Sequence, residues 1–146
     1  MIDRALVIRK INLILKDLKA IESFGRMSID AYLGDPVNEP AAERYLERII
    51  GRMIDINYHI VTELGDPPPR DYYESFIALA RRRVLPMDFA QVIAQSAGLR
   101  NRIVHEYDEI DERKVFEALR DALRDIPLYI DHVHRFLEES GQAPGP

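Results

Sequence analysis

One short segment of the sequence, Leu99 to Tyr107, concentrates side chains that could carry out a reaction. Arg100 and Asn101 are followed by His105 and then by Tyr107. A histidine titrates near neutral pH and can act as general base or general acid. A guanidinium forms paired hydrogen bonds with phosphate oxygens and stabilises the charge of a phosphorane. These side chains therefore fit the cleavage of RNA by internal attack of a 2′-hydroxyl.

The spacing of these residues indicates how they would have to be assembled. On a helix Asn101 and His105 share one face, whereas Arg100 lies about 140° away from His105. A single helix thus offers one imidazole and one guanidinium, although the reaction needs both a base and an acid. Two-fold pairing of identical helices would place two of each in one cleft. The sequence therefore predicts a homodimer that needs no metal ion.

Other kinds of catalytic site find little support in the sequence. Cysteine is absent, so thiolate nucleophiles and zinc–thiolate sites are excluded. His59, His132 and His134 lack the spacing of metal ligands and are interpreted as packing or surface residues. The chain also has no glycine-rich phosphate loop and no nucleophile elbow. We expect neither a metal nor a cofactor.

The composition fits one compact cytoplasmic domain. The chain has 146 residues and a net charge of −5, and its apolar runs are far shorter than the roughly 20 residues of a membrane span. Because its first residues form a charged, amphipathic stretch with no apolar signal region, we expect a cytoplasmic protein. An acidic protein must bind RNA through a local basic patch, for which Arg102 and the run Arg81, Arg82 and Arg83 are candidates. Alternatively, these arginines belong to solvated helix ends, where Arg102 could pair with Glu106.

The elements that must position these residues are helical throughout, because apolar side chains recur every three to four residues. We predict an all-α antiparallel bundle of four long helices and a short one, in a single domain over residues 1–139 with a flexible tail over 140–146. Pro127 should kink the last helix without ending it. The expected helices cover Ile2 to Phe24, Ala41 to Leu64, Tyr72 to Arg82 (the short one), Pro86 to about Tyr107, and a final helix capped by Asp111.

The motif Arg-Asn-x-x-x-His-x-Tyr at residues 100–107 resembles the signature of the HEPN superfamily, and especially of its HepT toxin branch. The resemblance continues in order and spacing through residues 43–50, 55–61, 69–76 and 99–111, which is nearly the whole chain. It implies an endoribonuclease toxin of a type VII toxin–antitoxin system. By this resemblance Arg100 and His105 are the catalytic pair, and Asn101 helps to orient them.

The resemblance also implies a partner and a means of control. HepT toxins are inactivated by a minimal nucleotidyltransferase antitoxin, MntA, which attaches AMP to the motif tyrosine, and Tyr107 matches that position. Two other functions stay open: a non-catalytic HEPN binding module that serves a nucleotidyltransferase, and a helical scaffold or dimeric adaptor. A neighbouring nucleotidyltransferase reading frame would favour the first two functions, and toxicity on expression without it would favour the nuclease.

Overall fold

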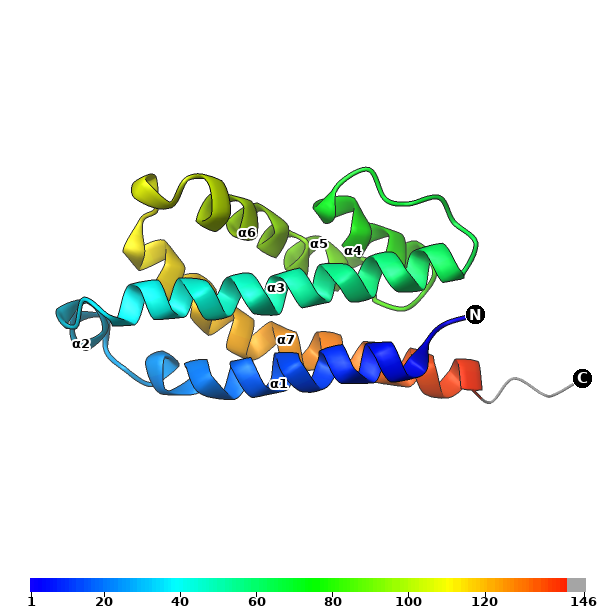
Figure 1. Ribbon diagram of the computed structural model, residues 1–146, viewed down its shortest axis with the longest axis horizontal. Coiled ribbons are helices and arrows are strands. Elements are labelled where there is room, and N and C mark those ends of the chain that lie inside the picture. Colours follow the sequence, from blue (N-terminus) through cyan, green and yellow to red (C-terminus); the bar gives the residue numbers. More distant parts are fainter. Residues whose placement is uncertain (142–146) are drawn as a thin grey trace, which may run out of the picture.

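The protein folds into a bundle of helices, described for residues 1–141 and, at Tyr107, for the backbone only, in a computed structural model (Figure 1). The expectation of an all-α fold is confirmed for these residues. The helices in chain order are α1 (Arg4–Gly25), α2 (Ile29–Gly34), α3 (Asn38–Glu63), α4 (Tyr72–Arg81), α5 (Met87–Ile93), α6 (Gln95–His105), the 3₁₀ turn η1 (Tyr107–Glu109) and α7 (Glu112–Gly141).

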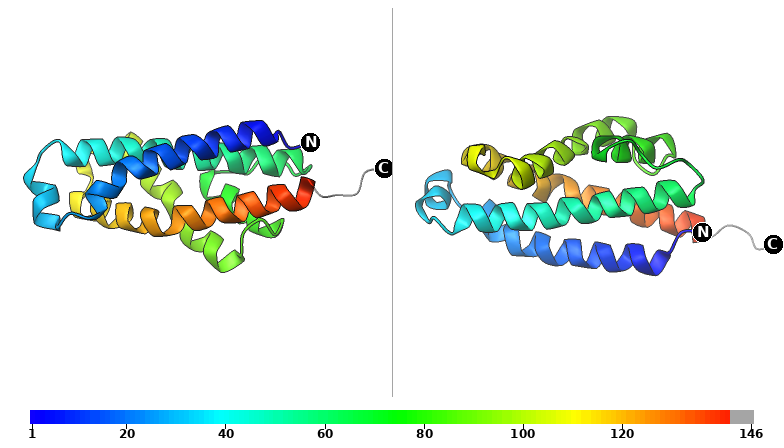
Figure 2. Two further views of the ribbon diagram at one scale, coloured as in Figure 1. Left: turned by 90° about the horizontal axis from the view of Figure 1, so that it is seen from below. Right: turned by 45° about the horizontal axis from the view of Figure 1, so that its top comes forward.

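The long helices α1, α3 and α7 pack side by side, and α6 closes the bundle antiparallel to α3 (Figures 1 and 2). Helix α3 is the central element, since it contacts α1, α4, α6 and α7. Its apolar face is fully buried, as are the facing stripes of α1 and α7. Such burial is the main source of stability in a helical bundle. No helix of the described chain is long and apolar enough to cross a membrane.

Polar side chains determine where the helices begin. The carboxylates of Asp3 and Asp71 accept hydrogen bonds from the amides of Leu6 and Glu74 in the first turns of α1 and α4. Asp111 caps α7 in the same way, accepting from the amide of Arg113 at 3.0 Å, as the sequence predicts. Each cap pairs an amide that has no partner within its helix.

The single helix expected between Pro86 and Tyr107 is wrong, because Ala94 divides it into α5 and α6. The Ser96 hydroxyl donates to the Ile93 carbonyl at 2.6 Å. The amide of Ala97 donates to the carbonyl of Ala94, three residues earlier, at 3.1 Å, and not to the residue four positions earlier as in a continuous α-helix. Local hydroxyl-to-carbonyl bonds of this kind compete with the helix ladder and bend it. The break lets α6 take its own direction across α3.

Two prolines lie inside helices. Pro40 precedes the helix expected from Ala41, but the structure places it in the first turn of α3, where amides have no helical partner anyway. Pro127 lies inside α7, which continues on both sides of it as predicted. Helix α7 also includes Ser140 and Gly141, which the sequence assigned to the tail. Residues 142–146 lie outside the described part of the chain.

A buried polar network ties three helices together at the centre of the bundle. The Tyr129 hydroxyl of α7 donates to Asn57 Oδ1 of α3 at 2.6 Å, and Asn57 Nδ2 donates to Ser75 Oγ of α4 at 3.1 Å. All three residues are fully buried. Because every member has a partner, the network fixes the register of α4 on α3 rather than weakening the core.

Candidate active site

Helix α6 carries the motif and ends within it. Arg100 is half-buried, whereas Asn101 and His105 are exposed. His105 is the last residue of α6, and the Glu106 amide closes the final turn on the Arg102 carbonyl at 2.8 Å. Tyr107 therefore begins the 3₁₀ turn η1 instead of continuing the helix. Its side chain lies outside what the structure describes.

The Arg100 guanidinium is held over an aromatic ring. Its Cζ lies 5.3 Å from the ring centroid of Tyr72, at the start of α4. Arg100 Nη1 donates a long hydrogen bond, 3.5 Å, to Asn101 Oδ1. Tyr58 meets the Tyr72 ring edge-to-face at 6.3 Å and donates its hydroxyl to the Pro69 carbonyl. Burial raises the pKa of that hydroxyl, so Tyr58 stays neutral beside the guanidinium.

The His105 imidazole is exposed at the end of α6. Within the described residues it has no hydrogen bond or ion pair, so both ring nitrogens are accessible to a ligand. Five residues of helix separate it from Arg100 by about 7.5 Å along the axis and about 140° around it. The two side chains of one protomer therefore leave α6 in different directions.

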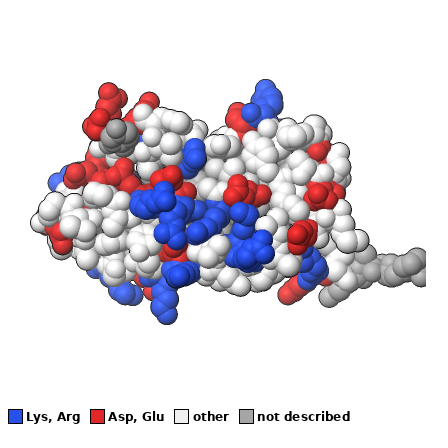
Figure 3. Space-filling view, viewed as in Figure 1, with Lys and Arg blue, Asp and Glu red and all other residues white. Residues whose placement is uncertain are grey.

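Arg100 opens onto a groove that crosses α3, here called the Gly51 groove, which is lined by Glu47, Arg48, Gly51, Arg52, Ile54, Asp55, Tyr58, Tyr72 and Arg100. Lysine and arginine side chains gather over this face of the molecule (Figure 3). Arg48 Nε and Arg52 Nη1 both contact Asp17 Oδ2 of α1, at 3.1 and 2.6 Å. The groove thus concentrates arginine side chains on one face of an acidic protein.

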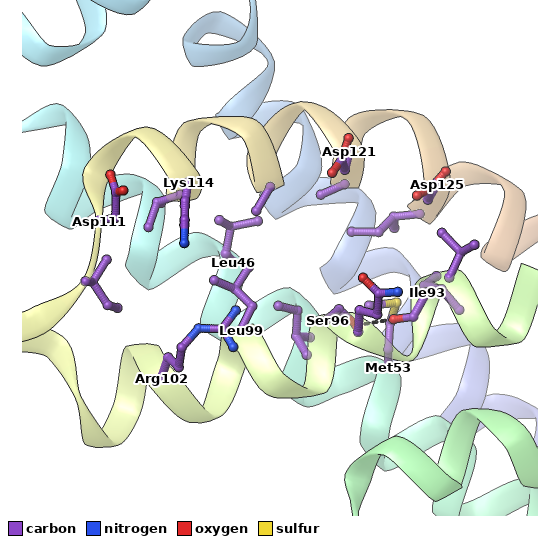
Figure 4. Close-up of a pocket in the computed structure, with 18 of the residues that line it drawn as sticks. Leu46, Met53, Ile93, Ser96, Leu99, Arg102, Asp111, Lys114, Asp121 and Asp125 are labelled. Carbon is purple, nitrogen blue, oxygen red and sulfur yellow. Dashed lines mark hydrogen bonds between the residues drawn. The ribbon is translucent and has the colours of Figure 1, made fainter.

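Arg102 points to the other side of α6. It lines a pocket of about 550 Å³ between α3, α6 and α7, with Leu46 and Met53 on the floor. Arg102 and Lys114 extend toward each other from opposite walls of this pocket (Figure 4). The structure therefore does not bring Arg102 together with Arg100, although the two residues are neighbours in the motif.

The run Arg81 to Arg83 lies at the opposite end of α3. Arg82 donates to the Leu64 carbonyl and to Asp66, and Arg81 pairs with Glu74. Arg83 has a φ of 63°, in the left-handed region, where it ends α4. The run begins nine residues after Tyr72, so it lies about 14 Å along α4 from the ring that Arg100 contacts. The RNA-binding role of this run stays a prediction. Arg81 and Arg82 also have a structural role, because they pair with neighbouring carboxylates.

Two of the other histidines have structural roles, as the sequence indicates. His59 Nε2 accepts from the Asp3 amide at 2.9 Å, and the His132 ring packs 5.5 Å from that of Phe89. Within residues 1–141, no group of three or more His, Cys, Asp or Glu side chains is arranged to hold a metal ion.

Sequence reasoning missed three features of this site. Tyr72 was noted only as the start of a short helix and as part of the family resemblance, and its contact with Arg100 joins residues far apart in the chain. Nothing in the sequence around Gly51 indicates a groove. The arginines could have been found, because Arg44, Arg48 and Arg52 follow one another at four-residue spacing and so share one helix face.

Comparison with known proteins gives a consistent result. Residues 14–133 match the family model "Ribonuclease HepT-like". The chain is 37% identical over 136 residues to the "tRNA nuclease HepT" of Aphanizomenon flos-aquae, covering 93% of this chain and 92% of that protein. It is 29% identical over 86 residues to the "mRNA nuclease HepT" of Shewanella oneidensis, covering 59% and 65%. The tri-AMPylated Shewanella oneidensis HEPN toxin, solved in complex with its MNT antitoxin, superposes with a TM-score of 0.81 at 25% identity, covering 92% of this chain and 99% of that one.

Proposed function

This chain belongs to the HepT-like ribonuclease family, and from that premise we propose that it is a cytoplasmic endoribonuclease toxin that cleaves RNA without a metal ion. The observation that carries the proposal is the arrangement of the Arg100 and His105 side chains on α6. Arg100 is held by Tyr72 at the mouth of a basic groove, and the His105 imidazole on the same helix is exposed. These are the groups that phosphodiester transfer requires.

In the proposed reaction the 2′-oxygen of a ribose attacks the adjacent phosphorus. An imidazole takes the hydroxyl proton, the P–O5′ bond breaks, and a second imidazole returns a proton to the departing 5′-oxygen. The products are a 2′,3′-cyclic phosphate and a free 5′-hydroxyl. Arg100 stabilises the charge on the phosphorane oxygens, and Asn101 orients Arg100 through its side-chain oxygen.

The proposal requires a homodimer, because one chain has one motif histidine. With Arg100 and His105 leaving α6 in different directions, the guanidinium of one copy and the imidazole of the other can face the same phosphate. Two-fold symmetry then yields two imidazoles and two guanidiniums in one cleft. The partner that restrains this activity is a nucleotidyltransferase antitoxin of the MntA kind, like the MNT protein bound to the Shewanella toxin.

We place the control point at Tyr107. AMP attached to its hydroxyl would bring a phosphodiester with about one negative charge next to the end of α6, two residues beyond His105. That phosphate would compete with RNA for Arg100, and the nucleoside would block the cleft. The acidic residues Asp108 and Glu109 that follow are exposed, so an incoming enzyme can reach this turn.

The nuclease proposal is tested by incubating purified protein with total RNA in EDTA and identifying the cut ends. We expect 2′,3′-cyclic phosphate ends, and no cleavage of an oligonucleotide that carries a 2′-deoxyribose at the cut site. Strict dependence on added magnesium or manganese would reject the mechanism. A protein that cleaves no RNA under any of these conditions, but binds a nucleotidyltransferase, would support the non-catalytic binding module instead.

The control proposal is tested by co-expression with the neighbouring nucleotidyltransferase, followed by mass spectrometry. The added mass of AMP should map to Tyr107, and a Tyr107→Phe variant should remain toxic in the presence of the partner. AMP on a different residue, or full neutralisation of Tyr107→Phe by nucleotide transfer, would overturn this assignment.

A further inference from the structure

We infer that the Gly51 groove binds the sugar–phosphate backbone of the RNA strand that leads to Arg100. The inference rests on the proposed nuclease function and names where the substrate lies beyond the cut site. Three observations carry it. Gly51 is a glycine that neither the backbone nor the packing requires, Arg48 and Arg52 are held in place by one carboxylate, and the groove extends to Arg100.

Gly51 lies in the middle of α3, where glycine is unfavourable. Among the residues other than proline, glycine has the lowest propensity for a helix interior, well below that of alanine. The backbone does not require it, since Gly65 is the one glycine of the described residues with a positive φ. Packing does not require it either, because a Cβ at Gly51 would meet nothing within 4 Å. A bare helix backbone on the floor of a groove allows another molecule's backbone to approach closely.

The two arginines beside Gly51 are oriented by a buried carboxylate. Asp17 is almost fully buried and binds both Arg48 and Arg52. Arg48 uses Nε for this contact, so its terminal nitrogens remain available for an anion. Two guanidiniums share one carboxylate, which leaves a positive charge in place. Arg44 continues the same stripe of α3 toward its N-terminus, about 6 Å further along the axis.

The groove leads directly to the motif, since Arg100 and Tyr72 form its far wall. Its own carboxylates, Glu47 and Asp55, are already paired with Arg44 and Lys10. Together with these partners and Asp17, the groove has five cations and three carboxylates, in a protein whose net charge is −5. A second copy seated on the groove would bring like charges together, whereas a phosphate backbone neutralises them.

The test uses the full-length chain with His105→Ala, so that RNA is bound without being cut, and a labelled single-stranded RNA oligonucleotide. Gly51→Gln should weaken RNA binding about tenfold, because its side chain fills the floor of the groove. Gly51→Ala should weaken binding less while raising the midpoint of thermal unfolding by about 2–4 °C. A merely structural glycine would not move affinity and stability in opposite directions. Gly34→Gln is the matched control, since a Cβ there also meets nothing and Gly34 lies outside the groove.

A charge variant supplies a second readout. Arg48→Gln should make the slope of log affinity against log salt shallower by about 0.7, the value for one phosphate contact to a single strand. Arg135→Gln, which removes an exposed charge on α7, should leave the slope unchanged.

Several outcomes overturn the inference. Unchanged RNA affinity in Gly51→Gln and Arg48→Gln would end it, as would absence of RNA binding by the His105→Ala chain. A shift of Gly51→Gln from dimer to monomer would assign the groove to a second copy. Loss of antitoxin binding with unchanged RNA affinity would assign it to the antitoxin. Cleavage by the wild-type chain is measured separately, so a failure of the nuclease proposal is distinguishable from a failure of the groove.

Discussion

The guanidinium of Arg100 lies over the ring of Tyr72, with Cζ 5.3 Å from the ring centroid, and this contact joins the motif helix α6 to the start of α4. Tyr72 is braced by Tyr58, whose hydroxyl is anchored on Pro69. The arginine that we propose to be catalytic is thus positioned by residues outside the motif. Cation–π contacts at partly exposed sites contribute about 0.5–1 kcal/mol.

Tyr72→Ala should lower kcat/KM for RNA cleavage about two- to fivefold, which is the kinetic equivalent of that contact. Tyr72→Phe should retain most of the activity, since the ring remains. The measurement is initial cleavage rate on one oligonucleotide at several concentrations. Equal activity of the alanine and wild-type proteins would show that Tyr72 does not position Arg100.

His105→Ala should reduce the cleavage rate by roughly 10²–10⁴-fold, the usual contribution of a general acid or base. The free energy of unfolding should change by less than about 0.5 kcal/mol, because the side chain is exposed at a helix end. Cleavage kinetics on one RNA check the predicted rate, and denaturant titration checks the predicted free energy of unfolding. Exposed His134 on α7 provides the matched control, since His134→Ala should leave the rate unchanged.

Mixing inactive Arg100→Ala and His105→Ala proteins should restore part of the activity. In the heterodimer the shared cleft would hold one Arg100 and one His105, contributed by opposite copies, whereas each variant homodimer lacks one of these groups entirely. The heterodimer should therefore be more active than either variant alone but well below the wild type, because only one of the two imidazoles remains. The mixture is refolded together and assayed against each variant alone. A fully active monomer in sedimentation would contradict the dimer requirement.

Much of the fold could be predicted from the sequence because its signals are local. Apolar spacing located the long helices, and Asp111 marked a helix start that the structure has at that place. The break at Ala94 could not be predicted, because it depends on which carbonyl the Ser96 hydroxyl selects.

The candidate site was predictable only along one helix. The spacing of Arg100 and His105 is a property of α6 alone, so sequence suffices to find it. The ring beneath Arg100 belongs to α4, and Asp17, which orients Arg48 and Arg52, belongs to α1. Contacts of this kind depend on how helices pack, which periodicity does not specify.

Arg83→Gly should stabilise the protein by about 1 kcal/mol, because a side chain in the left-handed region is strained and glycine is not. Arg83 ends α4 in the position that glycine most often takes, with its amide bonded to the Ala80 carbonyl. Denaturant unfolding measures the gain. RNA binding measured on the same variant tests the separate prediction that the run Arg81 to Arg83 contacts RNA, since loss of affinity would support that role.

Glu39→Gln should make the protein more stable at alkaline pH. Burial, with repulsion from Glu43 and Glu112, raises the pKa of Glu39 from 4.5 to about 8. The fully buried Tyr32 packs against the same cluster, and its hydroxyl has no hydrogen-bond partner among the described residues. The folded state therefore holds a proton that the unfolded state releases between pH 4.5 and 8, so stability falls as pH rises through that window.

Because the amide of Glu39→Gln does not ionise, this variant should not lose stability as the pH rises from 4.5 to 8. Its melting temperature should exceed that of the wild type above pH 8, and the difference should shrink toward zero as the pH approaches 4.5. Glu117→Gln, an exposed change on α7, controls for the lost negative charge. A difference between Glu39→Gln and wild type that is the same at pH 5 and pH 9 would mean that Glu39 is ionised in the folded protein across this range.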